Sequence, residues 1–121
     1  MAENSPPQLI QSYGDGGFRI AGDPRRGSVI VFADRTVAWS AETFDDINEV
    51  SLAPVFATKS TVDLLLIGSG TQMKMVPAGL RAALREAGIA VEAMDTGAAC
   101  RTFNVLLAEG RRVAAALIAI G

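Results

Sequence analysis

Two short segments of this 121-residue chain carry residue types that could bind a ligand or a partner. The first is Gly68-Ser69-Gly70-Thr71, which follows an apolar run that is typical of a buried strand. Glycines in such a loop let the backbone approach a ligand, and free N–H groups there could cradle an anion. The loop completes neither a dinucleotide-binding motif, because Met73 stands where the third glycine should be, nor a P-loop. Two interpretations stay open: a weak anion-binding turn, or a turn whose glycines merely supply backbone freedom.

The second segment surrounds the start of a predicted helix and contributes five candidate residues: Asp95, Thr96, Cys100, Arg101 and Asn104. Asp95 or Thr96 is expected to cap the helix by accepting backbone N–H bonds. Cys100, near the helix N-terminus and beside Arg101, is in a setting that can lower a thiol pKa, although free cysteine usually behaves as a small buried apolar residue. Arg101 could hold an anion or a partner carboxylate. An ion pair with Glu109 or Asp95 is the preferred interpretation.

The residues that are missing restrict the chemistry further. The chain has no histidine and a single cysteine, so Ser-His-Asp and Cys-His catalysis are excluded and no Cys/His zinc site can be built. A carboxylate site for magnesium stays open. We therefore predict no catalytic residues, no specific zinc or copper site and no cofactor.

Charge and hydropathy restrict the partners and the cellular compartment that can be expected. The formal net charge of -2 gives no long-range attraction to nucleic acid, and the pairs Arg25-Arg26 and Arg111-Arg112 are interpreted as solvated turns. Residues 1–7 resemble no secretory signal and are predicted to be a disordered leader. The longest apolar run, residues 113–120, is too short to cross a bilayer. We expect a cytoplasmic protein that reaches a membrane, if at all, through a partner.

The elements that must position these segments can be read from periodicity. In the first half, residues 9–13 and 18–20 are predicted strands around a glycine-rich turn, and residues 28–33 and 36–40 form an antiparallel hairpin. Residues 45–58 are ambiguous, with Ser51 a candidate cap for a short helix.

The second half alternates strand and helix. Residues 62–67, 89–94 and 113–120 are predicted strands. One helix starts with Pro77 as its first residue and ends before Gly88; the next follows a cap at residue 95 or 96 and ends at Gly110. This β-α-β-α-β order requires a largely parallel sheet. We predict one compact three-layer α/β domain over residues 8–121, with a mixed sheet and N-terminal antiparallel hairpins. Residues 68–71 and 95–101 should then meet at the carboxyl edge of the sheet and form its main concave surface.

The second half also resembles a known family. The matching stretches are LLLIGSGT at 64–71, Pro77, and VEAMDTGAACRTFNVLLAEGRRVAAALI at 91–118. They resemble a family of small proteins of unknown activity (a domain of unknown function, Mth-type) that includes the mitochondrial respiratory complex I assembly factor three. The motif positions are Gly68, Gly70, Asp95, Thr96, Cys100, Arg101 and Asn104. The resemblance implies a three-layer α/β domain with a mixed sheet and no established catalytic residue.

Two functions follow as hypotheses. The leading one, which rests on the resemblance, is a non-enzymatic protein-interaction module that resembles an assembly factor and aids a membrane or respiratory complex; its partner is then another protein. The alternative is a small-ligand or anion-binding protein, or an enzyme, that uses the 68–71 loop with Arg101. A deep pocket at the loop would favour the alternative, and a shallow patch would favour a protein partner.

Overall fold

The computed structural model describes residues 7–58 and 61–121, and in this part of the chain the strands form two sheets. The smaller, antiparallel sheet contains, in spatial order, β1 (Ile10–Gly14), β2 (Gly17–Ile20) and β3 (Asp23–Arg26). The larger sheet contains, in spatial order, β5 (Thr36–Ala38), β4 (Val29–Val31), β8 (Val113–Leu117), β6 (Leu64–Gly68) and β7 (Ala90–Met94). The helical elements are a 3-10 turn η1 (Phe44–Asp46) and the α-helices α1 (Ala53–Phe56), α2 (Ala78–Glu86) and α3 (Thr96–Ala108). The leader predicted for residues 1–7 lies, apart from Pro7, outside the described residues.

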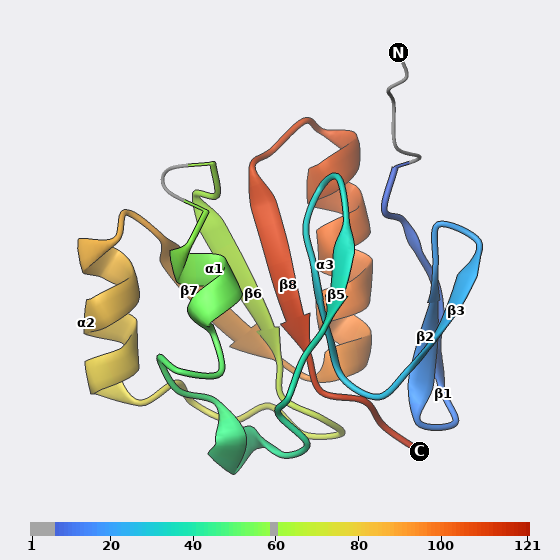
Figure 1. Ribbon diagram of the computed structural model, residues 1–121, viewed down its shortest axis with the longest axis horizontal. Coiled ribbons are helices and arrows are strands. Elements are labelled where there is room, and N and C mark those ends of the chain that lie inside the picture. The colour runs from blue at the N-terminus through green and yellow to red at the C-terminus, as the bar shows by residue number, and fades with distance from the viewer. Residues whose placement is uncertain (1–6, 59–60) are drawn as a thin grey trace.

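The larger sheet is mixed, and its two faces carry separate apolar clusters. β8, β6 and β7 are mutually parallel (Figure 1), whereas β4 runs antiparallel to both of its neighbours, β8 and β5. One face packs on α1 and α2 through side chains such as Val55, Leu80 and Leu84. The other packs on α3 through Phe103, and the smaller sheet adds side chains such as Ile20 to the same cluster. The predicted three-layer α/β domain with a mixed sheet is confirmed.

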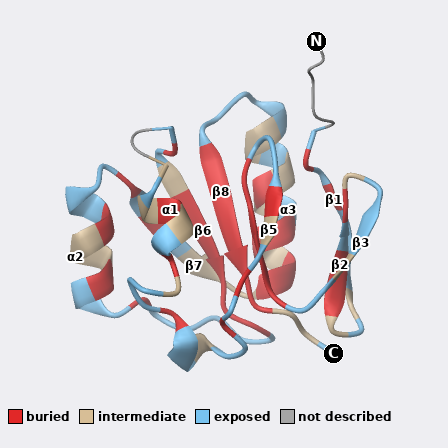
Figure 2. Cartoon of the chain, viewed as in Figure 1, coloured by how far each residue is buried: buried red, intermediate tan, exposed pale blue. Residues whose placement is uncertain are grey.

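β8 lies at the centre of the larger sheet although it is the last strand in the sequence. Its neighbours are β4 and β6, and all five of its residues are buried, as Figure 2 shows. Alanines at 114–116 suit this place, because a strand with a helix layer on each face has little room for larger side chains. The predicted strand ends earlier than expected, at Leu117. The residues after it turn toward the smaller sheet, where the Gly16 N–H donates to the Ile120 carbonyl at 2.9 Å.

The structure differs from the predicted elements in three further places. β3 was not predicted: Arg25 and Arg26 lie in a strand, because an edge strand tolerates Pro24 and charged side chains that disfavour central strands. Pro77 occupies the N-cap position of α2, without a side-chain capping hydrogen bond, and is not its first helical residue. Ser51 does not cap α1: its hydroxyl accepts a hydrogen bond from the Asn48 N–H at 3.0 Å instead. The predicted hairpin at 28–40 is confirmed as β4 and β5.

Candidate functional site

The two segments singled out from the sequence meet at the carboxyl edge of the parallel strands. The Thr96 N–H donates to the Gly70 carbonyl at 2.8 Å, and the Gly70 N–H donates to Thr96 Oγ1 at 3.0 Å. The first loop also contacts the end of β7, where the Ser69 N–H donates to the Met94 carbonyl at 2.9 Å. The predicted proximity of the two segments is therefore confirmed, and it follows from right-handed crossovers in a parallel sheet.

The space between the two segments is filled, however. Thr96 is fully buried, and its hydroxyl also donates to the Ile118 carbonyl at 2.8 Å. A Cβ added to Gly68 would lie 2.9 Å from Leu117 Cδ2 and 3.0 Å from Thr96 Cα. The prediction that residues 68–71 and 95–101 form the main concave surface is wrong, because the buried Thr96 side chain fills the space between the two segments.

A hollow of about 370 Å³ does lie beside the loop, but on its other side. Its walls come from Ser69, Gly70 and Thr71 together with residues 42–44, Gln72, Lys74 and the C-terminal residues 118–121. No residue of 95–101 lines it. A ligand in this hollow would therefore meet the loop without meeting Arg101.

The loop itself forms hydrogen bonds that hold it in place. The Ser69 hydroxyl donates to the Gln72 carbonyl at 2.6 Å and accepts from the Lys74 N–H at 3.2 Å. The N–H groups of Ser69 and Gly70 are also used within the protein, as described above. These N–H groups are not free to cradle an anion, and this arrangement favours the interpretation of the loop as a structural turn.

Of the two residues predicted to cap α3, Asp95 and Thr96, it is Asp95 that does so. Its Oδ1 accepts a hydrogen bond from the Ala98 N–H at 2.8 Å, and its own backbone is extended, as a cap requires. Thr96 is the first helical residue and uses its hydroxyl elsewhere.

Cys100 is buried against the larger sheet. Burial raises the pKa of its thiol to about 12; the nearby Arg101 charge acts in the opposite direction but is the weaker influence. The pKa of the Cys100 thiol is therefore raised and not lowered, because desolvation of the thiolate outweighs the Arg101 charge. The structure supports the alternative of a small buried apolar residue.

We therefore expect Cys100 to be unreactive in the folded protein. At pH 7 a thiol whose pKa rises from 9.0 to about 12 has on the order of a thousandfold less thiolate. A disulfide-exchange reagent should label the native protein far more slowly than the protein in denaturant. Cys100→Ala should lower the free energy of unfolding by at most about 1 kcal/mol. Labelling at equal rates in both states would contradict the buried position.

Arg101 and Asn104 both face β1. Arg101 is exposed, and its Nη1 lies 3.5 Å from the Tyr13 hydroxyl. The expected ion pair with Glu109 or Asp95 is wrong: within the described residues Arg101 forms none, because its side chain extends across to β1 and the Asp95 carboxylate caps the helix. Asn104 donates to the Ile10 carbonyl and accepts from the Ile10 N–H, each at 2.9 Å, and so fastens β1 to α3.

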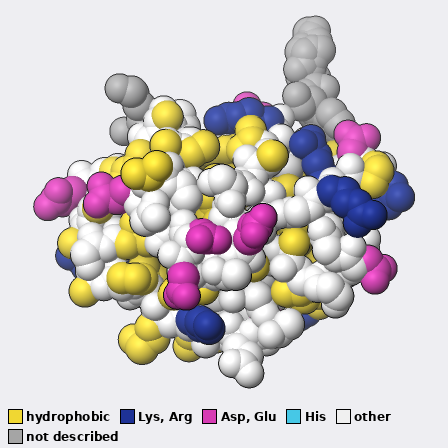
Figure 3. Space-filling model, turned by 60° about the horizontal axis from the view of Figure 1, so that its bottom comes forward, with side chains coloured by type: hydrophobic (Ala, Val, Ile, Leu, Met, Phe, Trp, Pro, Cys, Tyr) yellow, Lys and Arg dark blue, Asp and Glu magenta, His cyan; other side chains and the backbone are white. Residues whose placement is uncertain are grey.

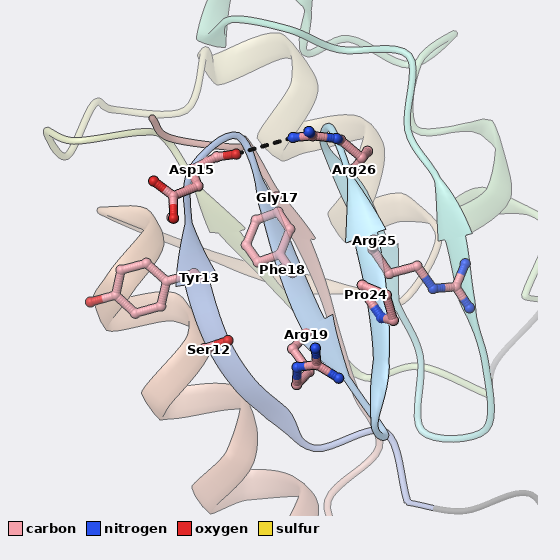
Figure 4. A pocket seen from close by; sticks show the side chains of 10 residues that line it. Ser12, Tyr13, Asp15, Gly17, Phe18, Arg19, Pro24, Arg25 and Arg26 are labelled. Carbon is pink, nitrogen blue, oxygen red and sulfur yellow. Dashed lines mark hydrogen bonds between the residues drawn. The ribbon is translucent and has the colours of Figure 1, made fainter.

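A second hollow, on the smaller sheet, was missed by the sequence analysis. It has a volume of about 630 Å³, and Arg19, Arg25 and Arg26 contribute to its walls (Figure 4). The signal in the sequence was the presence of three arginines within eight residues, 19–26, on a slightly acidic chain. It was overlooked because β3 was interpreted as a turn. Figure 3 shows basic side chains gathered at this end of the molecule.

Metal and membrane signals were also sought. Among residues 7–58 and 61–121, no group of three or more cysteine, aspartate or glutamate side chains is placed to hold a metal ion. Within the same residues, no helix is both long and apolar enough to cross a bilayer.

Residues 10–118 match the family model described as "Protein of unknown function (DUF498/DUF598)". This chain belongs to the DUF498 family. The match runs from the first residue of β1 to just past the end of β8, so it covers both sheets and all the helices. The resemblance seen in the sequence is thereby confirmed.

Relatives of this DUF498 protein include bacterial and animal proteins. An uncharacterized protein of Rhodobacter capsulatus is 44% identical over 90% of this chain and 82% of its own length. The NADH dehydrogenase [ubiquinone] 1 alpha subcomplex assembly factor 3 of Xenopus tropicalis is 35% identical over 91% of this chain. This chain spans only 60% of the length of that assembly factor.

The fold is also that of a solved structure. The crystal structure of an outer membrane protein from Bartonella henselae superimposes with a TM-score of 0.85 at 37% identity, covering 98% of this chain and 100% of the other. The DUF498 fold described above is thus seen in a relative of nearly the same length.

Proposed function

We propose that this protein is a non-enzymatic protein-binding module that aids the assembly of a respiratory NADH dehydrogenase. The observation that carries the proposal is the 35% identity to an assembly factor of that enzyme over 91% of this chain. The shared region covers 110 residues, so the part of the assembly factor that it resembles has the size of a folded domain and is not a short motif.

The state of the candidate chemical groups supports a binding role. Thr96 is buried with its hydroxyl bonded twice, and Cys100 has a raised pKa. Asn104 and Asp95 both use their side chains to hold backbone groups. Of the candidates on α3, only Arg101 presents an exposed charged side chain, and such a group is suited to contact with a partner.

Exposed apolar side chains supply further contact area. Met75 is 80% exposed and Met73 58% exposed, both in the loop between β6 and α2. Methionine side chains adapt to irregular partner surfaces because they are unbranched and polarizable. Tyr13, beside Arg101, is 41% exposed, and tyrosine and arginine are residue types enriched at binding hot spots.

The alternative, a ligand-binding site made by the 68–71 loop with Arg101, has less support. Arg101 does not line the hollow at the loop, and two of the loop's N–H groups are bonded within the protein.

Deletion of the gene in the organism that encodes this chain tests the assembly function. We expect less assembled NADH dehydrogenase on native gels and a matching loss of NADH oxidation by isolated membranes. Both should return when the wild-type gene or the Cys100→Ala variant is supplied, since the thiol plays no part. Normal amounts of the assembled enzyme in the deletion strain would refute the proposal.

A further inference from the structure

β7 is an edge strand of the larger sheet. The spatial order β5-β4-β8-β6-β7 leaves its outer side without a neighbouring strand in the described part of the chain. The helix α2 packs beside it at this end of the sheet (Figure 1). Backbone N–H and C=O groups on an open edge can pair with another chain. What this edge can bind therefore depends on which of its backbone groups point outward.

Two hydrogen bonds show which residues of β7 face β6. The Ala90 N–H donates to the carbonyl of the residue just before β6, and the Met94 carbonyl accepts from the N–H of the residue just after β6, each at 2.9 Å. Backbone groups alternate in direction from one residue of a strand to the next. Val91 and Ala93 therefore direct their N–H and carbonyl groups away from the sheet. We call these groups the β7 edge.

The other edges of the two sheets suit an added strand less well. On β1, the Asn104 side chain holds both the N–H and the carbonyl of Ile10. β3 contains Pro24, which has no N–H to donate. β5 has only three residues, whereas β7 has five and no proline. The β7 edge is thus the best place for an extended segment to join.

The Arg81 side chain already fills one position on the β7 edge. From α2, its Nη1 donates to the Val91 carbonyl at 3.0 Å. A hollow of about 400 Å³ lies at this point, and its walls include Arg81, Arg85 and residues 88–92. The guanidinium group thus stands where an N–H group of an added strand would donate. One side-chain hydrogen bond holds it there, so an incoming strand can displace it.

Glu92 decides which strand fits this edge. It lies between the two outward-facing residues, is exposed, and forms no ion pair within the described residues. A residue of an added strand that lies opposite Glu92 is on the same face, where an opposite charge stabilises the pair and a like charge destabilises it. Two copies of this chain that paired antiparallel through both Val91 and Ala93 would place Glu92 opposite itself. A second copy is therefore disfavoured, and a strand with a basic residue is favoured.

We propose that the β7 edge binds an extended strand of a partner protein, which carries a lysine or arginine opposite Glu92 and displaces Arg81 from the Val91 carbonyl. This inference rests on the protein-binding function proposed above and specifies the segment of the partner.

Titration of the isotope-labelled protein with the peptide acetyl-Thr-Val-Lys-Val-Thr-amide, followed by NMR, tests this inference. The amide signals of Val91 and Ala93 should shift, and their hydrogen exchange should slow at saturating peptide, because the peptide covers these N–H groups. A peptide with glutamate in place of the lysine should bind at least about fivefold more weakly, since it puts a like charge opposite Glu92.

Variants of the protein test the two side chains. E92K should reverse the preference, so that the glutamate peptide binds at least about fivefold more tightly than the lysine peptide. The matched control E49K makes the same charge change at an exposed position elsewhere and should keep the wild-type preference. R81M frees the Val91 carbonyl and should tighten binding of the lysine peptide about threefold. R85M removes the same charge from α2 and should bind as the wild type does.

N-methylated peptides test the backbone pairing without changing the protein. One peptide carries the methyl group on the lysine nitrogen, and the other carries it on both valine nitrogens. Alternate residues of an added strand face β7, so one of these peptides should bind at least about tenfold more weakly and the other should bind as before. Which of them loses affinity gives the direction of the added strand.

The inference is overturned if the lysine and glutamate peptides bind equally, if the shifted signals lie away from Val91 and Ala93, or if both methylated peptides bind as the unmodified one does. An unchanged affinity in R81M would show that Arg81 does not compete for the edge. Protection of Val91 and Ala93 in a dimer of the protein alone would identify a second copy as the occupant. If E92K fails to fold by circular dichroism, E92Q replaces it and should abolish the preference.

The result is separable from the assembly function. A deletion strain that lacks assembled enzyme, together with no peptide binding at β7, refutes only the role of the β7 edge. Peptide binding at β7 together with a normal deletion strain refutes the assembly function and leaves a binding edge whose partner belongs to another process.

Discussion

Thr96→Val is expected to lower the free energy of unfolding by about 2–4 kcal/mol. Valine has nearly the same shape, so packing is retained, but it cannot accept from the Gly70 N–H or donate to the Ile118 carbonyl. Both groups are buried, and each buried polar group without a partner costs about 1–3 kcal/mol. Urea unfolding followed by circular dichroism measures the effect through the shift of the midpoint.

Thr96→Ser is the matched control for this prediction. Serine keeps the hydroxyl and loses one methyl group, so its cost should be about 1 kcal/mol. A valine variant as stable as the wild type, or a serine variant as unstable as the valine variant, would show that the hydroxyl does not bridge the loop to the C-terminal strand.

Gly68→Ala is expected to destabilise the protein by about 1–3 kcal/mol, as overpacking of a buried site does. The new methyl group would meet the backbone at Thr96 Cα and the side chain of Leu117, both at about 3 Å. The backbone of α3 cannot withdraw without breaking the hydrogen bonds between Thr96 and Gly70. Thermal and urea unfolding of the purified variant give the free energy.

Gly79→Ala separates this packing effect from the general effect of replacing glycine. Gly79 lies in α2, where an added Cβ meets no atom within 4 Å. Alanine there should raise stability by about 0.5–1 kcal/mol, because it favours the helix over the unfolded chain. The prediction for Gly68 fails if the two variants shift stability in the same direction by the same amount.

The second half of the chain could be predicted because local signals and topology agree there. Helical periodicity ends at Gly88 and Gly110, and apolar runs between the helices leave only a parallel sheet. β3 could not be predicted, since Pro24 and the charged residues beside it, taken on their own, are typical of a turn. They become a strand only because β2 offers a partner and the edge faces solvent.

The candidate site was predictable in its position and not in its contacts. Strand order places residues 68–71 beside residues 95–96, and this holds in the structure. The side-chain partners depend on segments distant in sequence: Thr96 bonds to residue 118, and Arg101 reaches residue 13. Periodicity says nothing about such contacts, so the buried threonine and the exposed arginine could not be distinguished in advance.

The central place of β8 has a consequence for how the protein is made. During translation, β4 and β6 leave the ribosome long before the strand that joins them, and the backbone N–H and C=O groups on their facing edges stay unpaired until residues 113–117 appear. The larger sheet thus closes only after residues 113–117 have been synthesised, and closure joins segments far apart in sequence. A premature stop codon shortly before residue 113 would remove the central strand of the sheet. The product would be an unfolded chain that is degraded, and not a shortened domain.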